Sequence, residues 1–166
     1  MALSRRQFIR STLALVAAPL VARAEAREPE IIAYAGADDP AAFSRFAQRE
    51  SLNAVTVTVF HAQWCGPCKT LFSQLADMAG QPGQDFKVVG LDVGPRAFTT
   101  GPFRNIVAAN NVIGTPTMQF FVDGDRQFSR TGLCRDPDML ARYLRDLRAA
   151  LTGAGPARVF APRCDI

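Results

Sequence analysis

Two cysteines three positions apart are the residues of this chain most able to do chemistry. They are Cys65 and Cys68, in the segment WCGPCK at 64–69. A Cys-x-x-Cys pair can close a small disulfide ring and reopen it, because the second thiol already lies beside the first. At the start of a helix, unpaired backbone N–H groups and the positive helix end lower the pKa of a thiol from about 8.5 toward about 7. The spacing therefore predicts reversible thiol–disulfide exchange.

The two sulfurs have different predicted roles in that exchange. Cys65 is the more exposed sulfur and attacks, whereas Cys68 is shielded and resolves the mixed disulfide by attacking Cys65. Between them, Gly66 and Pro67 shape the turn, and Trp64 offers an apolar wall beside the exchange site.

Two other uses of the pair stay open. The cysteines could form half of a zinc site, but four ligands are needed and the other candidates, His61, Cys134 and Cys164, lack paired spacing. They could also form a purely structural disulfide, although a Gly-Pro dipeptide beside a tryptophan favours exchange. We therefore expect no bound metal and no cofactor.

Hydrophobic periodicity and turn residues divide the chain after residue 28 into alternating strands and helices. Asp-Pro pairs at 39–40 and 136–137 predict two of the helix starts, and Asp-Gly-Asp at 123–125 predicts a hairpin turn. The expected elements are strands at 30–36, 54–60 and 86–93, helices at 39–50, 70–80 and 103–110, a hairpin of 117–122 and 126–132, and a last helix at 138–151. This order predicts one α/β domain, a central mixed β-sheet flanked by helices on both faces. The cysteine pair lies where the second strand becomes a helix.

The first 26 residues have the features of a cleavable export signal. A basic end, SRRQFIR, precedes the apolar run STLALVAAPLVA and a small-x-small cleavage site at 22–24. The apolar run is shorter than the roughly 20 residues that span a bilayer, so we expect no stable membrane insertion after cleavage. The motif around Arg5, Arg6, Phe8 and Ile9 resembles the bacterial twin-arginine signal. A general secretory signal and a cytosolic N-terminal helix are the alternatives.

The predicted organisation is thus a signal at 1–26, a domain at 27–152 and a C-terminal tail at 153–166. The net charge of +4 belongs to the first 24 residues, which hold four of the 19 basic residues and none of the 15 acidic ones. The remainder is formally neutral and has no long basic run, so nothing favours a nucleic-acid partner.

Three features together resemble the thioredoxin family: WCGPCK, the segment Thr115-Pro116-Thr117 before the hairpin, and the closing amphipathic helix. The resemblance covers about residues 50–151 and implies the thioredoxin fold. It also implies that Pro116 follows a cis peptide bond and lies against the cysteines. Thr115 would then offer its backbone to an extended substrate segment.

The chain departs from that family at three positions. Thioredoxins usually have a buried aspartate six residues before the attacking cysteine and a lysine on the next strand, and here these positions hold Val59 and Gly90. The family's tryptophan four residues before the first cysteine is replaced by His61, the only histidine in the chain. We expect slower deprotonation of Cys68 as a result. His61 could relay a proton or be a packed bystander.

Cys134 and Cys164 are additional to the family pattern. In an oxidising compartment, two remaining cysteines suggest a second bridge that ties the tail to the domain. We expect Cys65 to pair with Cys68 and Cys134 with Cys164, while free thiols, an intermolecular bond or a second redox relay stay open.

These observations predict an exported, periplasmic thiol–disulfide oxidoreductase that acts on protein clients. A Gly-Pro dipeptide in related sites goes with a potential of about −270 mV, against about −120 mV for a dedicated oxidase, so we expect a reductant. A membrane protein would then supply its electrons. The alternatives are a periplasmic disulfide oxidase or isomerase, and a non-catalytic binding module that serves as a chaperone or metal carrier.

Overall fold

The computed structural model describes residues 30–79, 81, 83–96 and 98–155. Four helices and five strands form within these ranges. In chain order they are β1 (Ile31–Ala33), α1 (Pro40–Glu50), β2 (Val55–His61), α2 (Gly66–Ala79), β3 (Phe86–Asp92), α3 (Arg104–Ala109), β4 (Thr117–Val122), β5 (Asp125–Thr131) and α4 (Pro137–Leu151). The predicted order of strands and helices is confirmed.

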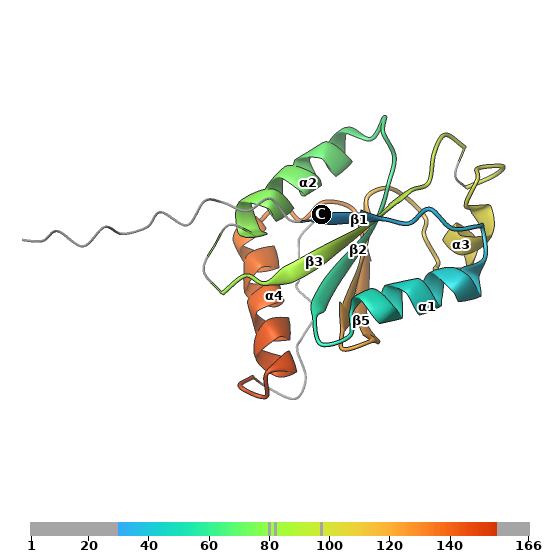
Figure 1. Cartoon of the computed structure of the whole chain (residues 1–166). Helices are drawn as coiled ribbons and strands as arrows, with labels where there is room; N and C mark the ends of the chain where they lie inside the picture. The colour runs from blue at the N-terminus through green and yellow to red at the C-terminus, as the bar shows by residue number, and fades with distance from the viewer. Residues whose placement is uncertain (1–29, 80, 82, 97, 156–166) are drawn as a thin grey trace, which may run out of the picture.

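The five strands form one mixed sheet in the order β1-β3-β2-β4-β5 (Figure 1). β3 pairs in parallel with both β1 and β2, whereas β4 pairs antiparallel with β2 and with β5. β2 is therefore a central strand, and its carboxyl end leads directly to the two cysteines.

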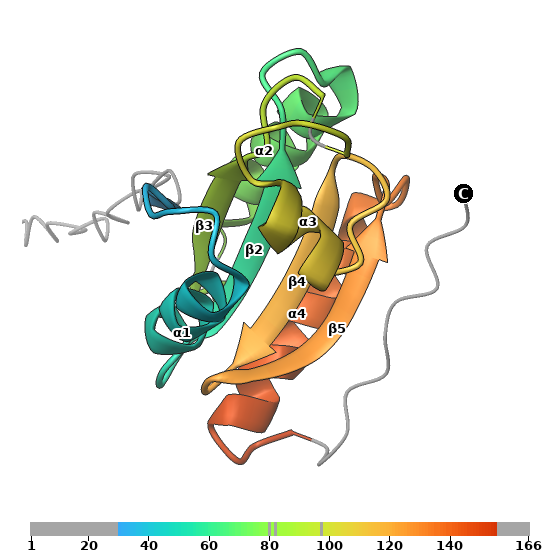
Figure 2. The ribbon, with the colours of Figure 1, turned by 90° about the vertical axis from the view of Figure 1, so that its right-hand side faces the viewer.

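Helices cover both faces of the sheet, as predicted; Figure 2 shows α1 and α3 in front of the strands and α4 behind them. Alternating residues of β2 explain the two layers. Val55, Val57 and Val59 join the first core cluster, with the apolar sides of α2 and α4. Phe60 joins the second core cluster, with residues of α1 and α3, and this second cluster also contains both cysteines.

Side-chain caps set two of the helix starts where the sequence predicts them. The Asp39 carboxylate accepts hydrogen bonds from the first N–H groups of α1, the nearest being Ala41 N at 2.8 Å. Asp136 does the same for α4, with Asp138 N at 3.0 Å. In both helices a proline follows the cap, where its missing N–H leaves no bond unmade.

Two elements differ from the expected bounds. β1 has three residues instead of seven, because beyond it Tyr34 makes only a single backbone bond, to Gly90 O at 3.0 Å. α2 begins at Gly66 rather than at residue 70, since Cys65 O accepts from the N–H groups of Cys68 and Lys69. The first turn has no apolar periodicity, so a pattern search starts this helix too late.

The predicted signal at 1–26 lies outside the described residues, as does most of the tail predicted at 153–166. Within the described ranges, no helix has the length and apolar content that crossing a membrane requires.

Candidate active site

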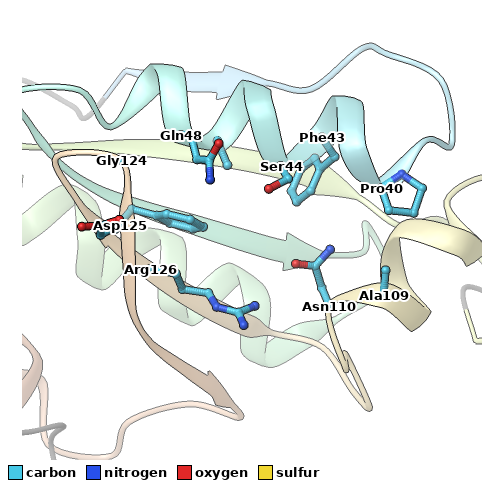
Figure 3. Close-up of a pocket in the computed structure, with 11 residues that line it drawn as sticks. Pro40, Phe43, Ser44, Gln48, Ala109, Asn110, Gly124, Asp125 and Arg126 are labelled. Atoms are coloured by element: carbon cyan, nitrogen blue, oxygen red, sulfur yellow. The ribbon is translucent and has the colours of Figure 1, made fainter.

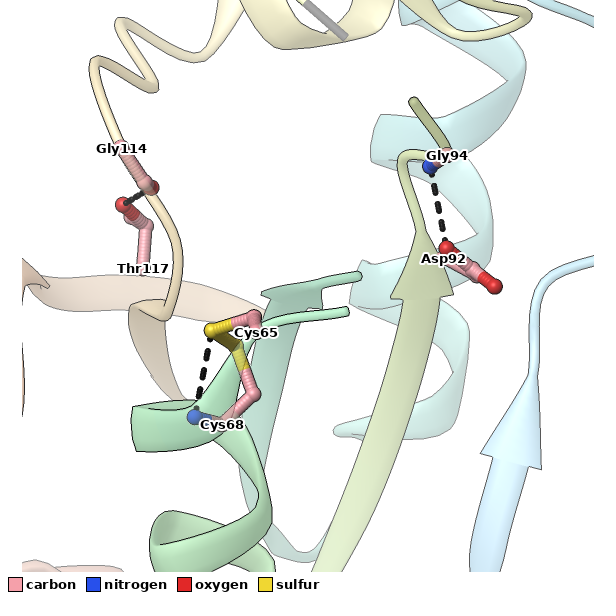
Figure 4. The surroundings of a disulfide bond; sticks show 6 residues. All are labelled: Cys65, Cys68, Asp92, Gly94, Gly114 and Thr117. Carbon is pink, nitrogen blue, oxygen red and sulfur yellow. Dashed lines mark hydrogen bonds between the residues drawn. A yellow bond between two sulfur atoms is a disulfide. The ribbon is translucent and has the colours of Figure 1, made fainter. Parts of the chain in front are cut away.

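Cys65 and Cys68 form a disulfide at the junction of β2 and α2 (Figure 4). Their Cα atoms are 5.3 Å apart. Cys65 directly precedes the helix and its N–H donates to Ala62 O at 3.0 Å, which ties the turn to the end of β2. Cys68 lies in the first turn of α2. The structure thus places the cysteine pair at a helix start, as the sequence analysis predicts.

Exposure does not distinguish the two cysteines in this disulfide form. Cys65 is 3% exposed and Cys68 is 2% exposed, so the expected shielding of Cys68 is present but the expected exposure of Cys65 is not. Both side chains belong to the second core cluster, and their bond holds Cys65 against it. Access to Cys65 therefore depends on the groups around it.

A hydrogen bond does distinguish them. The backbone N–H of Cys68 donates to Cys65 Sγ at 3.2 Å (Figure 4). When the bond opens, this N–H and the positive helix end favour negative charge on the Cys65 sulfur. The geometry therefore suits Cys65 as the thiolate and attacking residue.

Thr115 and Pro116 lie on the loop before β4, and the peptide bond between them is cis, as expected. Several hydrogen bonds hold this loop. Thr117 Oγ1 donates to Gly114 O at 2.7 Å (Figure 4) and lies 2.7 Å from Thr131 Oγ1 of β5. Pro116 O accepts from Gly132 N at 2.8 Å. The loop is thus fastened to the end of the hairpin.

A groove of about 420 Å³ joins α2 to this loop. Its walls are Pro67 and Thr70 of α2, the Thr115–Pro116 bond, and residues 130–133 and 135. Three of the sequence-predicted site residues, Pro67, Thr115 and Pro116, are therefore brought together. Trp64 is 63% exposed beside the cysteines, and Gly66 is also exposed.

Sequence reasoning missed the two arginines of the groove, Arg130 and Arg135. Arg130 belongs to β5 and Arg135 to the loop after it, far along the chain from the cysteines. Basic residues near a hairpin end give no signal of their own. Only the position of β5 at the sheet edge brings them near α2.

Val59 and Gly90 are adjacent in the sheet, as register partners in β2 and β3. Val59 is fully buried among apolar side chains. The positions that the family resemblance assigns to a carboxylate and an amine therefore hold no titratable side chain.

His61 lies at the end of β2 and is partly buried. Its ring meets Phe72 of α2 edge-on, with 5.0 Å between the ring centroids. A Cβ added at Gly90 would lie 3.3 Å from Nε2 of His61. Burial lowers the pKa of His61 from its ordinary value of 6.5, while the negative charge of Asp92 acts in the opposite direction. Burial therefore favours the neutral imidazole form of His61.

Cys134 is fully buried and is not a free thiol. Its sulfur lies 3.2 Å from Asp136 O, in the loop before α4. Cys164 lies outside the described residues, so the pairing of Cys134 with Cys164 stays a prediction. In the described part of the chain, no three His, Cys, Asp or Glu side chains group as a metal site would need.

A second hollow, of about 340 Å³, lies on the other side of the hairpin (Figure 3). Polar side chains from α1, the end of α3 and β5 face it, among them Gln48, Asn110 and Arg126. Neither cysteine lines it. The groove beside Pro116, by contrast, is lined by Pro67, which lies between the two cysteines in the chain.

Comparison with known proteins agrees with this geometry. The family model described as thioredoxin matches residues 39–146. Thioredoxin of Listeria monocytogenes is 30% identical over 78 residues, 47% of this chain and 69% of the relative. Mitochondrial thioredoxin-2 of Schizosaccharomyces pombe is 35% identical over 83 residues, 49% of this chain and 56% of the relative.

Among solved structures, thioredoxin from Trypanosoma brucei brucei is similar with a TM-score of 0.52 and 26% identity, over 74% of this chain and 95% of that one. This likeness confirms the predicted thioredoxin fold. Together with the disulfide-bonded Cys-x-x-Cys pair at a helix start, it leads to one conclusion. The chain belongs to the thioredoxin family and is a thiol–disulfide oxidoreductase.

Proposed function

We propose that this protein is an exported reductant that passes electrons to disulfides of client proteins through Cys65 and Cys68. The observation that carries the proposal is the N–H of Cys68 donating to Cys65 Sγ at 3.2 Å, at the start of α2. That hydrogen bond stabilises a thiolate on the residue beside the groove, which is the group that attacks a client. The Thr115–Pro116 loop lines the groove and is held by hydrogen bonds, which supports binding of an extended segment there.

The reaction starts from the dithiol form of the pair. The Cys65 thiolate attacks one sulfur of a client disulfide, and the other client sulfur leaves as a thiolate that takes a proton from solvent. Cys68 then loses its proton and attacks Cys65 Sγ, which releases the second client thiol and closes the disulfide seen in the structure. Two electrons reach the client, and the pair must be reduced again before the next cycle.

The preference for reduction over oxidation rests on the Gly66-Pro67 dipeptide between the cysteines. The residues at positions 59 and 90 bear on the rate at which Cys68 resolves the mixed disulfide. No titratable group lies at these positions to assist Cys68, so the resolving step should be slow and the mixed disulfide long-lived.

The proposal that the protein acts in the periplasm is based on the predicted signal at 1–26 and not on the fold. SRRQFIR and the apolar run after it support export by the twin-arginine route to the periplasm. Because a reductant there needs electrons from elsewhere, we propose a membrane protein as the donor. Replacing Arg5 and Arg6 by lysine should retain the protein in the cytoplasm. Continued export of that variant would favour the general secretory route.

The first experiment is the equilibrium potential of the Cys65–Cys68 pair in the mature protein, titrated in dithiothreitol or glutathione buffers. A value near about −270 mV supports the reductant, whereas one near about −120 mV would make the protein an oxidase or isomerase. If no reversible transition occurred, the chain would be a binding module.

The second experiment traps clients. Cys68→Ser should accumulate mixed disulfides with client proteins, because the resolving thiol is absent. Cys65→Ser is the matched control and should trap far less, since the attacking thiol is lost. Equal trapping by both variants would contradict the roles assigned to the two cysteines.

A further inference from the structure

The groove beside Pro116 combines an apolar floor with positive charge. Pro67, Pro116 and Leu133 supply apolar surface, while Arg130 and Arg135 supply the charge. None of the residues that line the groove is acidic. A third cation, Lys69, is exposed on α2 between two residues of the groove wall, Pro67 and Thr70.

The charge of Arg135 is available to a partner. Arg135 is exposed, and no carboxylate of the described residues lies within 4.0 Å of its guanidinium. The neighbouring Asp136 is already engaged, because it caps α4 and lies 3.6 Å from Arg142. Among the described residues, the charge of Arg135 is therefore not neutralised by a carboxylate.

From this we infer that the groove selects client segments with an aspartate or glutamate close to the reactive cysteine. The inference rests on the proposed function and names its substrate class. Pro67, which lies between the two cysteines, lines the groove together with Pro116, so a segment that brings its sulfur to Cys65 has its flanking residues close to the arginine-bearing wall. Complementary charge across such a surface raises the rate of productive encounter and disfavours partners of like charge.

The test uses short cyclic peptides with one internal disulfide that differ only beside one cysteine, with paired Asp, Ser or Lys residues there. Single-turnover reduction by excess pre-reduced protein is measured at low ionic strength. The rate for each peptide is divided by the rate at which dithiothreitol reduces the same peptide. This division removes differences in the peptides' own reactivity. We expect the Asp peptide to react roughly five- to tenfold faster than the Lys peptide. Addition of 0.5 M salt should remove most of that difference.

Two variants make the same charge change at different places. Arg135→Glu should reverse the order of the Asp and Lys peptides. Arg145→Glu changes an exposed residue of α4 that does not line the groove, and it should keep the wild-type order. Thermal unfolding of both variants checks that each is folded.

The outcomes separate this inference from the function on which it rests. If the Asp and Lys peptides react equally with the wild-type protein, or if Arg135→Glu does not alter their ratio, the acidic preference is wrong while the reductase function stands. If the Ser peptide is not reduced at all, the proposed function itself fails. Glutathione disulfide reacting as fast as the Asp peptide would overturn the assignment of an extended protein segment.

Discussion

His61 Nε2 lies so near Gly90 that a Cβ on Gly90 would be 3.3 Å from it. The same Cβ would lie 3.2 Å from Ile31 Cγ2. The imidazole thus occupies the space into which a side chain at position 90 would extend. The histidine on β2 and the glycine on β3 therefore depend on each other.

Gly90→Ala should lower the free energy of unfolding by about 1–2 kcal/mol, because the added methyl crowds a packed site. In a His61→Ala background the same change should cost clearly less, since one of the two crowding groups is gone. Urea unfolding of the four proteins in a double-mutant cycle measures this coupling. Additive effects would contradict the dependence of Gly90 on His61.

Val59→Asp would place a carboxylate in the first core cluster without a cation at Gly90. We expect a loss of about 3–5 kcal/mol in unfolding free energy at pH 7, since an unpaired buried charge is not solvated. Burial would raise the pKa of this carboxyl, so the loss should shrink as the pH falls toward 5. Val59→Asn, of similar size but without charge, is the control and should show little added pH dependence.

His61 should make the folded state less stable in mild acid. Its pKa is lowered by burial, so the unfolded chain takes up the proton first as the pH falls below 6.5. The contribution of neutral His61 is complete above that pH and is lost as the pH falls through the lower folded-state pKa. In His61→Phe, unfolding free energy should therefore decrease less between pH 7.5 and pH 5 than in the wild-type protein. Equal decreases would mean that protonation of His61 is not coupled to unfolding.

Asp38 caps α3 from a distant part of the chain. Its two carboxylate oxygens accept hydrogen bonds from Asn105 N at 3.0 Å and Ile106 N at 2.9 Å, although Phe103, at the N-cap position, makes no side-chain cap bond. Asp38→Ala should lower the free energy of unfolding by about 1–2 kcal/mol, as other lost caps do. Asp38→Asn keeps one acceptor oxygen and should lose less. Thermal unfolding of the two variants ranks these effects.

Local signals made much of this fold predictable. Asp39 and Asp136 mark helix starts because each side chain bonds to N–H groups two and three residues later. Cys65 and Cys68 reveal their chemistry because their reactivity depends mainly on being close together in the chain. Such signals need no knowledge of the tertiary structure.

The remaining features depend on contacts between distant segments. Asp38 bonds to residues 67 and 68 positions away, so it resembles part of an ordinary turn in the sequence. Arg130 and Arg135 form a groove wall only because β5 lies beside β4 at one edge of the sheet. His61 meets Gly90 only in the register of β2 with β3. Strand order and register decide all three contacts, and no local pattern specifies them.

The reactive bond is itself a part of the protein interior. Cys65 and Cys68 are members of the second core cluster, which also contains Phe43 of α1 and Ile106 of α3. Two separate thiols need more room than the bonded pair, so we expect each turnover to loosen and re-form the contacts beneath these two helices. The oxidation state should thus be readable away from the sulfurs, as a redox-dependent change in amide hydrogen exchange along α1 and α3.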